Sequence, residues 1–195
     1  MLHEALNKAG SDGVPLNTIT DWRWWPVPKG DGPPFYVCSK LGPSDREYCL
    51  IDRFEACTVD AVCPYASGAP CALPAQLSLS SFANCLEATH GCDSIDAAAP
   101  CAKSAGLDAV TVAAIQKCAA GDGAAAVMNH IYGVANASTP VVTGFPDIRI
   151  DSKTTPHAFP SFVEELERAI CVAYTGTHPK ACGPYFERAA AAAAM

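Results

Sequence analysis

The number and spacing of the cysteines constrain this chain more than any other feature. The 195 residues include 11 cysteines, and no two of them form a C-x-x-C pair. So many cysteines are rare in a reducing cytosol, and their wide spacing is typical of disulfides formed in an oxidising compartment. Because the count is odd, at least one cysteine has no partner within the chain. The cysteines stand at positions 38, 49, 57, 63, 71, 85, 92, 101, 118, 171 and 182.

The same spacing argues against a metal site. Zinc proteins usually present ligands in close pairs such as C-x2-4-C or H-x3-5-H, because neighbouring ligands must converge on one ion. No successive cysteines are that close, and the five histidines are scattered singly. The chain also has no G-x-S-x-G motif and no glycine-rich phosphate loop. We therefore expect neither a metal nor a cofactor.

Charge and hydropathy limit the partners. The chain has 13 basic and 20 acidic side chains, a net charge of -7, and no Lys/Arg cluster, so we expect no nucleic-acid partner. No apolar run reaches the ~18 residues of a membrane span. The N-terminal sequence MLHEALNKAG lacks the apolar core of a signal peptide. Since the cysteines indicate an oxidising lumen, we expect that the natural protein begins upstream of Met1.

Local patterns predict both strands and helices. Thr18–Trp25 is rich in β-forming residues and stops at a proline, which predicts a strand. The alternation around Ile148 and Ile150 predicts a second, half-buried strand. Asp108 is placed to cap a helix that ends before Gly121.

The C-terminal region contains the clearest helix start. Ser161 and Glu164 form a capping box, which predicts a helix to Tyr174 whose apolar stripe should pack on a sheet. In an earlier helix, Cys49 and Cys57 lie about two turns apart on one face, roughly 12 Å in rise. They therefore cannot bond each other, and each must reach another segment.

Three segments, taken in order, resemble one known family. EYCLIDRFEAC carries Cys49 and Cys57, and CAKSAGLDAVTVAAIQKC runs from Cys101 to Cys118. AICVAYTGTHPKAC contains Cys171 and Cys182. This order of motifs is similar to that of the gamma-interferon-inducible lysosomal thiol reductases, and the resemblance covers most of residues 35 to 182.

The resemblance implies a fold and an activity. The fold would be α/β: a thioredoxin-like core lacking its first strand, in one domain over residues 1–188, with a disulfide-rich α-helical insertion at about 45–135. Residues 189–195 would be a low-complexity alanine tail. The activity would be thiol-disulfide oxidoreduction on disulfide-containing protein substrates in a lysosomal or secretory compartment. The implied structural disulfide cysteines are Cys38, Cys49, Cys57, Cys85, Cys101, Cys118, Cys171 and Cys182.

The chain departs from the family at its redox centre. The family's C-x-x-C lies between the first strand and the first helix, so here it would stand upstream of Met1. No catalytic residue is then expected within the chain, which alone should be inactive. The family's C-Q-H-G reads Cys38-Ser39-Lys40-Leu-Gly. An alternative is a secreted, disulfide-stapled binding protein on the same scaffold without redox activity.

Cys63, Cys71 and Cys92 are additional to the family's set. Cys63 and Cys71 could close a local loop by bonding each other. A third hypothesis is that one additional cysteine has become a nucleophile, and Cys63, which precedes a proline, is the first choice.

Two further sites are expected. The resemblance aligns Pro146 with the family's substrate-facing proline, which predicts a cis Phe145–Pro146 bond. Asn136-Ala-Ser138 is a glycosylation sequence, expected in a loop.

Overall fold

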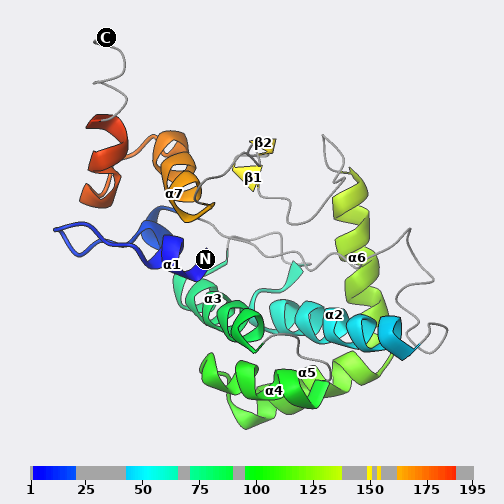
Figure 1. Cartoon of the computed structure of the whole chain (residues 1–195). Coiled ribbons are helices and arrows are strands. Elements are labelled where there is room, and N and C mark those ends of the chain that lie inside the picture. The colour runs from blue at the N-terminus through cyan, green and yellow to red at the C-terminus, as the bar shows by residue number, and fades with distance from the viewer. Residues whose placement is uncertain are drawn as a thin grey trace. The chain divides into compact units, whose positions relative to one another are not determined.

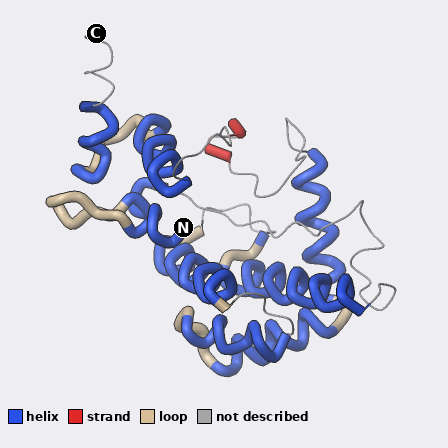
Figure 2. The backbone as a smooth tube through the Cα atoms, in the orientation of Figure 1, coloured by secondary structure: helices blue, strands red, loops and turns tan. Residues whose placement is uncertain are grey.

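The computed structural model describes residues 2–20, 43–65, 71–89, 95–137, 149–150, 153–154 and 162–187. The chain divides into two compact units, each described here by itself. Unit 1 comprises Met1–Asp21 and Val142–Met195, and unit 2 comprises Trp22–Val141. Figure 1 shows the elements in sequence colours, and Figure 2 marks helix, strand and loop along the same backbone.

The described part of unit 2 is helical. Its elements are α2 (Pro43–Val62), α3 (Leu73–Ala88), α4 (Ile95–Ser104), α5 (Ala109–Ala120) and α6 (Gly123–Ala137). α2 contacts all four of the other helices, and α4 also contacts α3 and α5. The long helix α2 is therefore the element around which unit 2 is organised.

Two apolar clusters form the core of unit 2. In the first, Phe54 of α2 packs with Phe82 of α3 and Ile115 of α5, and each is at most 1% exposed. In the second, Leu79 packs with Met128, and both are fully buried. Cys57 belongs to the first cluster, and Cys63 and Cys71 lie at the second.

Capping signals set the limits of α5 as the sequence predicts. The Asp108 carboxylate accepts a hydrogen bond from the backbone N–H of Thr111 at 2.7 Å, which satisfies a free donor of the first turn. Gly121 ends the helix, and its N–H donates to the carbonyl groups of Lys117 and Cys118. The predicted cap at Asp108 and the predicted helix end before Gly121 are both confirmed.

The described part of unit 1 consists of helices and short elements around them. Its helices include α1 (Leu2–Asn7) and α7 (Phe162–Ala173), with 3-10 helices at Leu16–Ile19 and Lys180–Cys182 and further helical residues at 183–187. The two-residue strands β1 (Arg149–Ile150) and β2 (Lys153–Thr154) form an antiparallel pair. α7 packs on α1, on β1 and on both 3-10 helices.

The expected α/β fold with a thioredoxin-like core is wrong. The described residues form a helical, disulfide-rich fold, and the strands among them are limited to the pair β1 and β2. The apolar stripe of α7, with Leu166 and Ile170 each 6% exposed, packs on helices and this small pair rather than on a larger sheet. Helices α2–α6 occupy the region in which a disulfide-rich helical insertion was expected.

The strand predicted for Thr18–Trp25 is also wrong where the structure describes it. Thr18 and Ile19 belong to the 3-10 helix. The Thr18 hydroxyl donates to the carbonyl of Pro15 at 2.7 Å, and the Thr20 hydroxyl donates to that of Asn17 at 3.3 Å. Such local side-chain bonds to the backbone favour a turn over a strand.

Candidate functional site

The nine cysteines in the described part of the chain are all disulfide-bonded. Cys49 is bonded, and the other eight form four pairs. Cys38 and Cys92 lie outside the described residues. The pairs are Cys57–Cys118, Cys63–Cys71, Cys85–Cys101 and Cys171–Cys182.

Two of the disulfides each join two helices of unit 2. Cys57–Cys118 joins α2 to α5 with a Cα–Cα distance of 6.1 Å, and Cys85–Cys101 joins α3 to α4 at 5.4 Å. Cys49 and Cys57 do lie on one helix and do not bond each other. These bonds fit a protein of an oxidising secreted or lumenal compartment.

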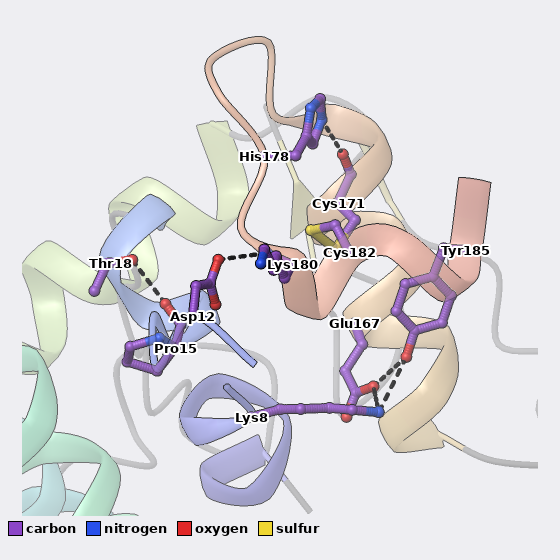
Figure 3. Close-up of a disulfide and its surroundings, with 10 residues drawn as sticks. All are labelled: Lys8, Asp12, Pro15, Thr18, Glu167, Cys171, His178, Lys180, Cys182 and Tyr185. Carbon is purple, nitrogen blue, oxygen red and sulfur yellow. Dashed lines mark hydrogen bonds and ion pairs between the residues drawn. A yellow bond between two sulfur atoms is a disulfide. The ribbon is translucent and has the colours of Figure 1, made fainter. Parts of the chain in front are cut away.

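Unit 1 contains a buried carboxylate, that of Glu167. Glu167 of α7 is 2% exposed, and its Oε2 accepts a hydrogen bond from Lys8 Nζ at 2.6 Å and another from the Tyr185 hydroxyl. Figure 3 shows these three side chains converging near the Cys171–Cys182 disulfide. The hydrogen bond to Glu167 raises the pKa of Lys8, and burial raises that of Tyr185.

Further contacts join the N-terminal and C-terminal parts of unit 1. The backbone N–H of Lys180 donates to the Asp12 carboxylate at 2.7 Å, as Figure 3 shows. This bond is the main reason that the pKa of Asp12 is lowered. His178 Nε2 lies 3.0 Å from the carbonyl oxygen of Cys171. The polar groups around this disulfide thus satisfy one another, as expected of a structural cluster.

We expect Lys8→Met to lower the free energy of unfolding by about 2 kcal/mol, because it leaves the buried Glu167 carboxylate without its cationic partner. The Lys8 side chain is 47% exposed, so the cost falls below that of a fully buried pair. Urea unfolding followed by circular dichroism measures the change.

Arg168→Met is the matched control. Arg168 pairs with Glu165 on the same helix, but this pair is exposed, and its loss should cost less than about 1 kcal/mol. The double variant Lys8→Met/Glu167→Met should recover most of the stability, since no unpaired charge remains. Equal losses for Lys8→Met and Arg168→Met would contradict the structural role of Glu167.

Unit 2 contains a second carboxyl group with an unusual environment. Burial, with a smaller effect of the Asp52 charge, raises the pKa of Glu55 to about 8. Burial also raises the pKa of Tyr65, which is 7% exposed and has its ring centroid 6.0 Å from that of His130. Between about pH 4.5 and pH 8, Glu55 is therefore neutral in the folded chain, whereas an ordinary glutamate is charged.

Several predicted site residues cannot be placed. Phe145 and Pro146 lie outside the described residues, as does Ser161 of the capping box. Asn136 stands in the last turn of α6 and not in the expected loop.

Within the described ranges, no group of three or more His, Cys, Asp or Glu side chains could hold a metal ion. None of the helices described there has the length and apolar character needed to cross a membrane.

Sequence reasoning missed the Glu167 cluster, although α7 contains a signal for it. Glu167 lies three residues before Ile170 and therefore falls on the apolar stripe of the helix. A charged residue within such a stripe indicates a buried ionic partner. The partner itself, Lys8, is 159 residues away in sequence.

The comparisons with known proteins found nothing similar: no family model, no curated protein and no solved structure matches the chain.

Proposed function

We propose that this chain is the disulfide-linked helical part of a thiol-disulfide oxidoreductase that reduces protein disulfides in a lysosomal or secretory compartment. The catalytic C-x-x-C would be encoded upstream of Met1. The proposal depends on the cysteine motifs and their pairing, and it does not include a thioredoxin-like core for the described residues.

The observation that carries the proposal is which cysteines pair. Six of the cysteines assigned to the reductase-like framework form three pairs among themselves, and the additional Cys63 and Cys71 form the fourth. Cys57–Cys118 joins the first quoted motif to the second, and Cys171–Cys182 closes the third. Roughly one in seven random pairings of these eight cysteines keeps the two sets apart, so the observed pairing is compatible with the resemblance.

The environment of Glu55 supports an acidic location. Because the pKa of this carboxyl group is raised to about 8 in the folded chain, the folded state loses stability as the pH rises above about 4.5, and it is more stable at acidic than at neutral pH. A lysosomal protein would benefit from this dependence.

Reduction of insulin disulfides at pH 5 tests the function. The chain that begins at Met1 should show no activity above the thiol background, because thiol-disulfide exchange needs an attacking and a resolving thiol. The product of the full transcript should contain an upstream C-x-x-C and be active, and serine substitution of either cysteine in that pair should abolish the activity.

The second candidate is a disulfide-stapled binding protein. The observation in its favour is that the nine described cysteines are all bonded, which leaves no thiol nucleophile among them. A full transcript without any C-x-x-C, whose product leaves insulin intact, would reject the reductase and support this candidate.

A further inference from the structure

The disulfide between Cys63 and Cys71 closes the shortest loop of the four described pairs. Its cysteines are 8 residues apart, whereas the other pairs are separated by 11, 16 and 61 residues. In the chain-entropy model, a disulfide that closes a short loop restricts the unfolded chain least. Opening Cys63–Cys71 should therefore lower the free energy of unfolding less than opening any of the other three pairs.

Position also distinguishes this pair. α2 ends at Val62 and α3 begins at Leu73, so Cys63 and Cys71 both lie in the connection between two helices. A thiol can therefore bond to Cys63 without the unfolding of either helix. The other pairs have both cysteines within helical elements: Cys57 in α2, Cys118 in α5, Cys85 in α3, Cys101 in α4, Cys171 in α7 and Cys182 in the last 3-10 helix.

The two sulfur atoms differ in their electrostatic environment. The N–H of Cys63 donates to the carbonyl of Val59 at 2.7 Å at the negative, carboxyl end of α2, and the acidic Asp60 stands in the same last turn. Cys71 directly precedes Ala72, the N-cap of the 16-residue helix α3. The two helix ends therefore favour a thiolate at Cys71, near the positive end of α3, over one at Cys63, while the apolar surroundings of Cys71 act against this preference.

The exposure of the two cysteines also favours attack on Cys63 rather than on Cys71. Cys63 is partly exposed, whereas Cys71 is 5% exposed and packs in the second apolar cluster. Gln76 Nε2 donates to the Cys71 carbonyl oxygen at 2.7 Å and so holds this residue in place. An incoming thiolate thus reaches Cys63 more easily, and the sulfur with the lower thiolate energy is the better leaving group.

We propose that Cys63–Cys71 is a thiol-exchange site at which the chain takes up a small monothiol of the glutathione class. The monothiol's thiolate attacks Sγ of Cys63 and forms a new S–S bond. The Cys63–Cys71 bond breaks, and its electron pair leaves on Cys71 as a thiolate. A second monothiol can then attack the mixed disulfide, releasing the oxidised dimer and leaving the two cysteines reduced. This site is independent of the proposed function, because it needs no C-x-x-C.

Peptide mapping of the folded full chain in graded reduced glutathione at pH 7.5 tests the site. After an acid quench and alkylation, we expect glutathione on Cys63 and the alkylating group on Cys71. This species should form at a glutathione concentration about tenfold below the one that opens any other described pair. Opening of another pair first, or glutathione mainly on Cys71, would overturn the proposal.

The variant Asp60→Asn tests the electrostatic reason. It removes the carboxylate near Cys63 while keeping an oxygen that can accept the Tyr65 N–H, which now bonds Asp60 Oδ1 at 3.0 Å. The preference for Cys63 over Cys71 should fall about threefold. An unchanged preference would reject a role of the Asp60 charge. If the variant does not fold, the peptide map of the unaltered chain still decides the proposal.

Discussion

Glu55→Gln should make the chain more stable at pH 8 and leave its stability at pH 4 nearly unchanged. In the folded state the pKa of Glu55 is raised from the usual 4.5 to about 8, mainly by burial. Between these two values the folded chain holds a proton that the unfolded chain has released. The free energy of unfolding therefore falls as the pH rises from about 4.5 to 8, and it remains at the lower value above pH 8.

The full effect of this carboxyl group is up to about 5 kcal/mol, since each pH unit of difference between the two pKa values contributes about 1.4 kcal/mol. Glutamine has nearly the same shape and does not ionise, so the variant should lose this pH dependence. Urea unfolding from pH 4 to pH 8.5, with the chain and the variant compared at each pH, measures the difference.

Glu165→Gln is the matched control. The pKa of this glutamate is lowered, chiefly by its hydrogen bond to Arg168, so it contributes stability at higher pH that is lost only as the pH falls through its folded pKa. It should leave the slope between pH 5 and pH 8 unchanged. Parallel curves for the unaltered chain and Glu55→Gln over this range would reject the effect of Glu55.

The features predicted correctly from sequence depend on neighbouring residues. The limits of α5 follow from the Asp108 cap and from Gly121, both within the segment that they define. The exclusion of a Cys49–Cys57 bond required only the rise of one helix. The strand prediction for Thr18 failed for a reason that is also local, because its hydroxyl satisfies the Pro15 carbonyl and favours a turn.

The pairing of distant residues could not be predicted. Cys57 and Cys118 are 61 residues apart, and Lys8 and Glu167 are 159 apart. Neither partner has a local signal that identifies the other, because each contact depends on how complete helices pack. The thioredoxin-like expectation came from motif order alone, and motif order does not specify the elements between the cysteines.

Replacing Cys57 and Cys118 with alanine should destabilise unit 2 by about 4 kcal/mol, the largest loss for any described disulfide. This pair closes the longest loop, with a separation of 61 residues, so its removal restores the most freedom to the unfolded chain. It also joins α2 to α5 at the first apolar cluster, where Cys57 is 2% exposed. The measurement is the urea midpoint under non-reducing conditions.

Replacement of Cys63 and Cys71 with alanine is the control. It also removes two sulfur atoms, but the disulfide that is lost closes a loop with a separation of only 8 residues. Its expected loss is about 2.5 kcal/mol. The loss for Cys85 and Cys101, separated by 16 residues, should lie between the two. Such an order would show that loop length determines the contribution of each bond. A larger loss at Cys63 and Cys71 than at Cys57 and Cys118 would instead assign the stability to local packing, and it would remove the energetic reason for thiol exchange at the short loop.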